Sequence, residues 1–258
     1  MAERRKRYTG NKRYGLLDTI RGITLCSMIG YHLSWDLVYL LGISWPWYHS
    51  SGAFYWQQSI CWTFILLSGF CIPLSHHRIR RGIVVSLCGV LVTVVTLAFA
   101  YDDRVIFGVL TLIGASMLIT GILYRPLGKV PRILGLVISA YLFYLTRWIN
   151  AGTITLFPGH TLALPSALYH GYVATFFGFQ APDFYSTDYF SLFPWLFLYL
   201  AGFFFGRLIF ESGAKDAKIL RLQVPPLSFL GRHSLLIYLL HQPVITAVLV
   251  LVQRHPVL

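Results

Sequence analysis

Long apolar stretches are the feature of this sequence that most restricts its fold. Hydrophobic residues make up 56% of the 258-residue chain and charged residues only 12%, whereas an ordinary soluble domain contains about 25% charged residues. Several stretches reach the roughly 17–25 residues that a helix needs to cross a bilayer. Backbone groups inside lipid must pair within their own segment. The sequence therefore predicts an all-α fold, a polytopic transmembrane helical bundle.

About seven spans are expected, and together they form one transmembrane domain over residues 14–254. A basic cytoplasmic tail, residues 1–13, precedes it. A cleavable signal peptide is not expected, because the first apolar run is too long and no small-residue cleavage site follows it. The cysteines lie inside apolar runs and indicate packing, not a disulfide set or a metal site. The predicted spans are residues 16–41, 53–75, 82–100, 105–124, 132–147, 189–210 and 228–252.

The distribution of basic residues predicts the orientation of the spans. If the amino terminus is cytoplasmic, nearly all Lys and Arg residues of the connections lie inside, and only Arg104, Arg147 and Arg254 lie outside. Such an excess is the positive-inside signal of multi-pass proteins. We therefore attribute the formal net charge of +12 to topology and expect no nucleic-acid partner. The expected location is a bacterial plasma membrane.

One further stretch, Leu162 to Phe179, is apolar enough to cross the membrane. A crossing there would move the lysine-rich connection at 207–221 to the outside, against the charge rule. We therefore predict an outer re-entrant or interfacial segment, broken near Pro165. Residues 148–188 then form one long extracytoplasmic excursion, and loops of this length usually carry function.

The first span contains four ionisable side chains, Asp18, Arg21, His32 and Asp36. Asp18 and Arg21 are three residues apart near the cytoplasmic end. They fit an interfacial ion pair whose arginine reaches the headgroups as well as a phosphate-binding role for Arg21. His32 lies about 16 Å further along the helix, too deep to reach that interface.

Asp36 follows His32 by one turn on the same helix face. A carboxylate placed there can hold the imidazole in one tautomer and raise its basicity, as a general base requires. Ionisable residues inside a membrane are usually functional, which favours a catalytic His32. The alternative is a histidine hydrogen-bonded to a neighbouring helix, with Asp36 reaching the outer headgroups.

Other polar side chains complete the candidate site. His241 lies deep in the last span, before Pro243, and either belongs to the site or stabilises a kink. Asp188 precedes the sixth span, where it could cap the helix or bind a substrate with Tyr189 and Trp195. The basic residues at the cytoplasmic end of the third span, which form either a solvated face or a phosphate site with Arg21, are Arg78, Arg80 and Arg81.

Several of these blocks resemble a known family in the expected order. LDTIRGITLCSMIGYHLSWDL and FILLSGFCI, then VIFGVLTLIG, DYFSLFPWLFLYLAGFFFG and LGRHSLLIYLLHQPV, are similar to the bacterial heparan-alpha-glucosaminide N-acetyltransferase catalytic-domain-like family of membrane acyltransferases. The resemblance covers about residues 13–250. The spacing of Arg21 and His32 is also similar to the first-helix signature of the wider membrane acyltransferases that decorate polysaccharides.

The resemblance implies an enzyme that takes an acetyl group from cytoplasmic acetyl-CoA. The acceptor would be an amine or hydroxyl of an extracytoplasmic sugar or glycan. His32 would match the catalytic histidine of the wider acyltransferases, with Asp36 and His241 beside it. Arg21, with the arginines of the third span, would hold the CoA phosphates. The other expected partner is membrane lipid, and a homodimer is compatible with the sequence.

Two other functions fit the same residues. A proton-coupled small-molecule transporter could use His32, Asp36 and His241 as a relay, although the paired halves that are typical of transporters are not seen. The second of these functions is that of a membrane subunit without catalytic activity in a cell-envelope assembly. No metal site is expected.

Overall fold

The computed structural model describes residues 14–212 and 218–254. The expected basic tail, residues 1–13, lies outside this part of the chain. The helices are α1 (Gly15–Tyr39), α2 (Ser51–Cys71), α3 (Arg78–Phe99), α4 (Val109–Ile122), α5 (Tyr124–Lys129), α6 (Arg132–Thr146), α7 (Gly171–Phe177), α8 (Trp195–Phe210), α9 (Pro225–Arg232) and α10 (Ser234–Arg254). Strands β1 (Thr153–Phe157) and β2 (His160–Ala163) form an antiparallel hairpin.

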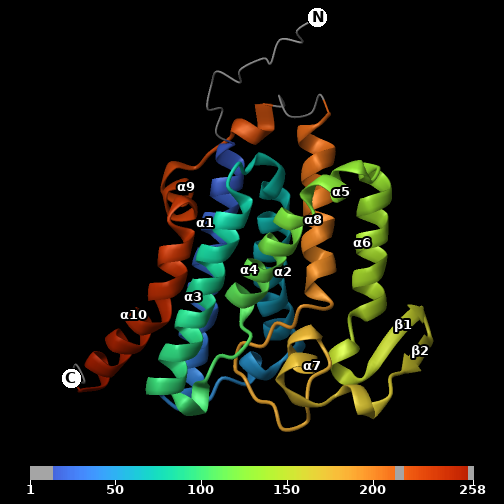
Figure 1. Cartoon of the computed structure of the whole chain (residues 1–258). Helices are drawn as coiled ribbons and strands as arrows, with labels where there is room; N and C mark the ends of the chain where they lie inside the picture. The colour runs from blue at the N-terminus through green and yellow to red at the C-terminus, as the bar shows by residue number, and fades with distance from the viewer. Residues whose placement is uncertain (1–13, 213–217, 255–258) are drawn as a thin grey trace, which may run out of the picture.

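Short 3-10 turns connect many of these helices. They are η1 (Pro46–His49), η2 (Ile72–Leu74), η3 (Tyr101–Asp103), η4 (Ile149–Ala151), η5 (Ser166–Leu168) and η7 (Lys218–Arg221). The long helices run along a common direction and form a bundle (Figure 1). We call the end that holds the start of α1, α5 and η7 the basic end. The opposite end, which holds the β-hairpin and α7, is the hairpin end.

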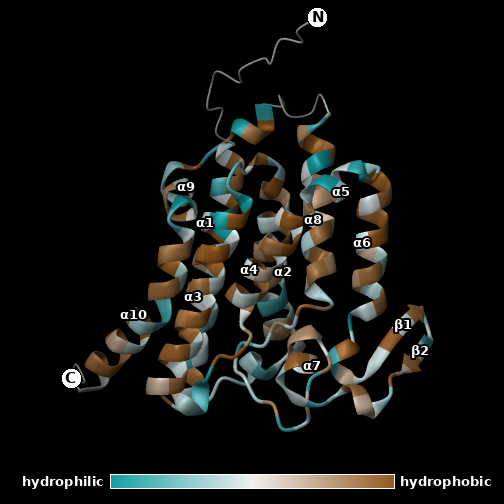
Figure 2. Ribbon diagram, in the orientation of Figure 1, coloured by the Kyte–Doolittle hydropathy of each residue, from teal (hydrophilic) through white to brown (hydrophobic). Residues whose placement is uncertain are grey.

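The bundle is that of an integral membrane protein. Four helical segments are long and apolar enough to cross a membrane: Ser51–Leu74, Arg78–Phe99, Arg132–Ala151 and Ser234–Val252. Apolar side chains such as Leu87 on α3 and Leu251 on α10 are about 60% exposed, as a lipid-facing surface requires. Figure 2 shows these helices as mainly hydrophobic along their length.

The expected number of about seven spans is not confirmed. The segments predicted at 105–124 and 189–210 form the shorter helices α4 and α8, of 14 and 16 residues. Helix α1 has 25 residues, but it contains Asp18, Arg21 and Asp36. The remaining four predicted spans coincide with the four segments above.

Two further predictions about the elements need correction. The last span, predicted over 228–252, is broken at His233 into α9 and α10, and α9 packs along α1, where Thr19 and Ser228 share a hydrogen bond of 2.7 Å. The fold is also not purely helical, because residues 153–163 form the β-hairpin. The sequence pattern gave no signal for it.

The stretch 162–179 forms no membrane-crossing helix. It contains the end of β2, η5 after Pro165, and α7, which has only seven residues. A helix of this length spans about 10 Å, far less than the roughly 30 Å of a hydrocarbon core. The expected break near Pro165 is therefore present.

Helix α8 is central to the core. Tyr199 and Phe203 are fully buried, and the helix packs against α2 and α6. A Cβ added at Gly202 would meet the carbonyl oxygen of Leu66 on α2, and one at Gly206 would meet that of Phe70. The two helix backbones are therefore in direct contact, as the small-xxx-small spacing predicts.

Arg207 fastens the basic end of α8 to the turn between α5 and α6. Its guanidinium donates to the carbonyl oxygens of Leu127, Gly128 and Val130 at 2.9–3.0 Å. It also pairs with Glu211 at 2.9 Å. The buried guanidinium thus supplies hydrogen-bond donors to carbonyl groups that have no partner within their own helix at the end of α5.

We expect Gly202→Ala to destabilise the protein by about 1–3 kcal/mol, because the added methyl group separates α8 from α2. Alanine is otherwise the better helix former by about 1 kcal/mol. Gly128→Ala is the matched control, since no atom lies within 4 Å of a Cβ added there. Thermal unfolding in detergent measures both variants, and equal midpoints would contradict this account of the α2–α8 contact.

Candidate functional site

The structure brings two predicted catalytic residues together across the α1–α10 contact. The ring centroids of His32 and His241 are 4.7 Å apart, with the planes at 67°. Both side chains are half-buried. This pair forms although 209 positions of sequence separate the two histidines, because α10 returns along α1 (Figure 1).

The hydrogen bond of His241 defines its tautomer. Nδ1 lies 2.5 Å from the carbonyl oxygen of Tyr238. A carbonyl oxygen only accepts, so Nδ1 carries the proton and Nε2 carries the lone pair. Nε2 is buried and has no hydrogen-bond partner among the described residues. The ring therefore presents an unused proton acceptor inside the bundle.

Asp36 does not contact His32 in the way the i+4 spacing predicts. Its carboxylate accepts hydrogen bonds from Gln242 Nε2 at 2.7 Å and Thr246 Oγ1 at 3.2 Å, and the residue is 1% exposed. Both donors belong to α10, one turn apart. Asp36 thus fixes α10 against α1 and sets the position of His241, the neighbour of Gln242.

Asp188 caps a different helix from the one expected. Helix α8 begins only at Trp195, and Asp188 Oδ2 instead accepts from the backbone N–H of Val109, at the start of α4, at 3.1 Å. The hydroxyl of Tyr238 is its second partner. Burial raises the pKa of Asp188, and these two hydrogen bonds lower the pKa part of the way back.

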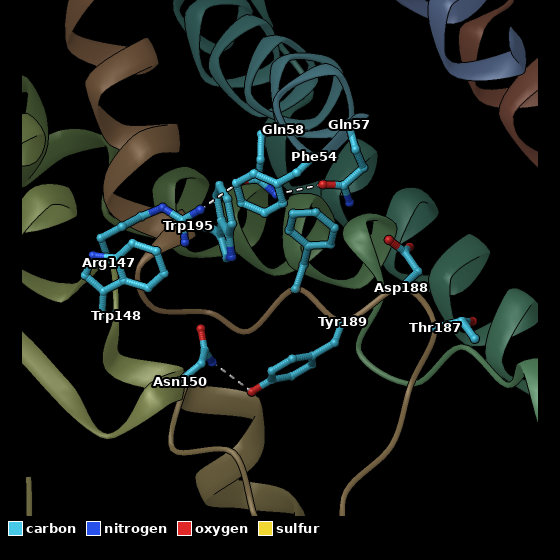
Figure 3. A pocket seen from close by; sticks show the side chains of 11 residues that line it. Phe54, Gln57, Gln58, Arg147, Trp148, Asn150, Thr187, Asp188, Tyr189 and Trp195 are labelled. Atoms are coloured by element: carbon cyan, nitrogen blue, oxygen red, sulfur yellow. Dashed lines mark hydrogen bonds between the residues drawn. The ribbon is translucent and has the colours of Figure 1, made fainter. Parts of the chain in front are cut away.

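The three predicted substrate-binding residues line one cavity at the hairpin end. Asp188, Tyr189 and Trp195 contribute to a cavity of about 280 Å³ (Figure 3). Its remaining lining residues are aromatic, amide-bearing, hydroxyl-bearing or cationic: Phe54, Gln57, Gln58, Arg147, Trp148, Asn150, Thr187 and Phe190. Aromatic faces combined with amides and one carboxylate suit a sugar.

Two hydrogen-bond networks fix the walls of this cavity. Arg147 donates to Gln58 Oε1 at 2.8 Å, and Gln58 donates to Gln57 at 2.7 Å. On the other wall, Asn150 Nδ2 lies 3.2 Å from the Tyr189 hydroxyl, which donates to the Thr175 carbonyl at 2.6 Å. The lining is therefore preorganised by its own contacts.

Sequence reasoning missed several of these residues. Arg147 was counted only as one of the few outer basic residues, and Tyr238 was not singled out. The adjacent amides Gln57 and Gln58 lie inside an apolar run, and that pattern was a usable signal. Asn150 follows the end of α6 and carried no comparable signal.

A second cavity of about 260 Å³ adjoins the first and shares Phe54 and Gln57 with it. Its lining is rich in aromatic side chains of α1 and η1, among them Tyr31, Trp35 and Tyr48. Neither of these two cavities is lined by His32 or His241. The histidine pair is linked to the first cavity through Tyr238, whose ring is 5.4 Å from that of His241 and whose hydroxyl bonds Asp188.

The predicted phosphate-binding arginines lie at the basic end. Arg21 donates to Asp18 at 3.3 Å and to Cys71 Sγ at 3.4 Å. Arg78 is held over the ring of Tyr124 at 3.5 Å. Arg80 and Arg81 are exposed.

Comparison with known proteins gives one match. The family model described as heparan-alpha-glucosaminide N-acetyltransferase, catalytic, matches residues 13–243. A search of curated proteins found no match, and neither did a search of solved structures. The family match covers α1 to α9 and reaches the middle of α10, including both histidines and the lining of both cavities. The chain therefore belongs to the heparan-alpha-glucosaminide N-acetyltransferase catalytic family.

Proposed function

We propose that the protein transfers an acetyl group from acetyl-CoA, bound at the basic end, to an amine or hydroxyl of a sugar bound at the hairpin end. The family supplies the reaction class, acetyl transfer. The exposed arginines and the larger cavity lie at opposite ends of the bundle, which supports separate sites for donor and acceptor. In this proposal the basic end is cytoplasmic, in accordance with the positive-inside rule.

One observation carries the proposal: a continuous set of contacts joins the hairpin-end cavity to the histidine pair. Asp188 lines the cavity and bonds the Tyr238 hydroxyl. The ring of Tyr238 lies beside His241, which lies beside His32. Asp188 and Tyr238 therefore lie between the cavity and the histidine pair, and in this proposal the acceptor passes these two side chains to reach His32.

The basic end offers a site for the donor. Arg80 and Arg81 are exposed and accessible to phosphates, and Arg21 at the same end donates to Cys71 Sγ. Arg21 and His32 are about 16 Å apart along α1. The extended pantetheine arm of CoA would cover this distance and bring the thioester toward His32. Arg78, which lies on Tyr124, contributes to the local positive potential.

In the proposed reaction, His32 takes the proton of the acceptor O–H or N–H while the acceptor attacks the thioester carbonyl. The new C–O or C–N bond forms, the C–S bond breaks, and the CoA sulfur receives the proton from the imidazolium. His241, with a free Nε2, assists in holding that proton. Asp36 positions the pair without touching the reacting atoms.

An alternative in which the same residues relay protons for a transporter is not favoured, because the family match is to an acetyltransferase. The contacts of Asp36 also argue against a proton relay. Its two carboxylate oxygens accept hydrogen bonds from Gln242 and Thr246, and neither of these side chains can pass on a proton by titrating.

We expect His32→Ala to lower acetyl transfer by about 10²–10⁴-fold, the usual contribution of a general base. Protein in vesicles is supplied with labelled acetyl-CoA and candidate sugar acceptors, and the acetylated product is measured. The control is His170→Ala, at an exposed position before α7. Undiminished transfer by the His32 variant would remove this residue from the mechanism.

A second prediction concerns the pH dependence of acceptor binding. Tyr238→Phe removes a hydrogen bond that lowers the pKa of Asp188, so this pKa rises further and a higher pH is needed to ionise the carboxylate. If ionised Asp188 binds the acceptor, the pH at which KM for the acceptor improves moves upward in the variant. The measurement is KM for the acceptor as a function of pH. If the profile of the variant is not shifted, ionised Asp188 does not bind the acceptor.

A further inference from the structure

Arg147 is an unusual group to find at the hairpin end of the bundle. It ends α6 and is one of few basic residues at this end. Its side chain is half-buried and lines the larger cavity. A guanidinium removed from water costs free energy unless an anion or several acceptors satisfy it.

The described part of the chain satisfies this guanidinium only in part. Its hydrogen bond is the one to Gln58, and none of the described carboxylates lies within ion-pair distance of it. The nearest carboxylate of the cavity lining, Asp188, is on the opposite side (Figure 3). Asp188 is also already bonded to Val109 and Tyr238.

Aromatic rings hold the guanidinium in place. Its carbon lies 4.9 Å from the ring centre of Trp195 and 5.2 Å from that of Trp148. These contacts stabilise the cation, and apart from the bond to Gln58 the planar N–H donors have no acceptor among the described residues. Such a fork matches the two oxygens of a carboxylate, sulfate or phosphate group.

We propose that the Arg147 end of the cavity is a specificity subsite for an anionic group carried by the sugar acceptor. The anion is a carboxylate, a sulfate or a phosphate, and Trp148 and Trp195 flank it. This inference rests on the proposed function in taking the cavity as the acceptor site. In this arrangement Arg147 binds the anionic group at one end of the cavity, and Asp188 binds a hydroxyl or amine of the same sugar at the other end.

Its size fits one substituted sugar unit. The volume of about 280 Å³ is just below the usual range of ligand pockets, roughly 300–1,000 Å³. The amides of Gln57 and Asn150 also line the cavity, and the Gln57 amide nitrogen and the Asn150 amide oxygen can bond to ring hydroxyls. A longer glycan could continue into the adjoining aromatic cavity through Phe54 and Gln57, which line both.

The test measures binding without acetyl-CoA, on the full-length protein in phosphatidylcholine nanodiscs. Glucuronate, glucose 6-phosphate and uncharged glucose are titrated while tryptophan fluorescence is followed, since two tryptophans flank Arg147. We expect at least tenfold tighter binding of the anionic sugars than of glucose. Arg147→Gln should bind the anionic sugars and glucose about equally tightly, and Arg147→Lys should retain part of the preference for the anionic sugars.

Arg104→Gln is the matched control, because Arg104 lies at the same end, packs on Tyr101 and Tyr185, and lines neither cavity. It should keep the wild-type preference. If Arg147→Gln fails to fold, the ratio of the wild-type affinities for anionic and for neutral sugars still tests the proposal. A ratio near one, an unchanged preference in Arg147→Gln, or no binding of any sugar would each overturn the proposal.

Two further outcomes separate related ideas. Glycerol 3-phosphate that binds as tightly as the anionic sugars would identify a lipid-headgroup site and contradict a sugar subsite. Binding of anionic sugars by a protein that transfers no acetyl group would keep the subsite and reject the proposed reaction. Failure of one proposal is therefore distinguishable from failure of the other.

Discussion

The carboxylate of Asp36 is the contact on which the arrangement of the candidate site depends. It is buried on α1 and accepts hydrogen bonds from two side chains one turn apart on α10. Hydrogen bonds to a charged group are worth about 1.5–3 kcal/mol each, and the burial of Asp36 keeps water from replacing them. The exposed apolar residues of α10, among them Leu240, Val244 and Val248, lie on one face of the helix, and Ile237 and Tyr238 pack against the core. The pairing of Gln242 and Thr246 with Asp36 adds polar contacts to this packing, and together they place His241 beside His32.

The irregular segment between α7 and α8 shows how a non-helical chain is kept inside such a bundle. Its backbone is bonded to elements distant in sequence: Phe190 N–H donates to Phe107 O at 2.8 Å, and Leu192 N–H to Phe176 O at 2.7 Å. Side chains add to this, as Asp188 does with Val109. Here the same bonds that satisfy the backbone also hold Asp188, Tyr189 and Trp195 around one cavity, so the stability of this segment and the shape of the cavity have a common origin.

The parts of this architecture that the sequence predicted are those fixed by local pattern. Apolar runs located the helices, the spacing of Gly202 and Gly206 is typical of a close helix contact without naming the partner, and aromatic residues beside Asp188 predicted a shared site. The predictions that were wrong concern side chains whose hydrogen-bond partners are distant in sequence. The spacing of His32 and Asp36 is compatible with a hydrogen bond, but Gln242 and Thr246 compete for the carboxylate and only the packed α10 reveals them. Asp188 likewise caps α4, because the segment that carries it crosses over Val109 before α8 begins. The sequence indicates only the expected side of the membrane for Arg147, because its aromatic neighbours, and the lack of a described carboxylate within ion-pair distance, are properties of the packed structure.

The distance between the two imidazoles limits how many protons the pair can hold. Two positive charges 4.7 Å apart repel by about 3–4 kcal/mol at an effective dielectric constant near 20, so one added proton is strongly preferred over two. In the proposed transfer, the acceptor releases one proton and the departing CoA sulfur takes up one. A pair that stores a single proton between these two events matches that stoichiometry. The bond from His241 Nδ1 to the Tyr238 carbonyl keeps Nε2 as the accepting atom throughout, and the backbone of α10 thereby determines which nitrogen of the pair takes part.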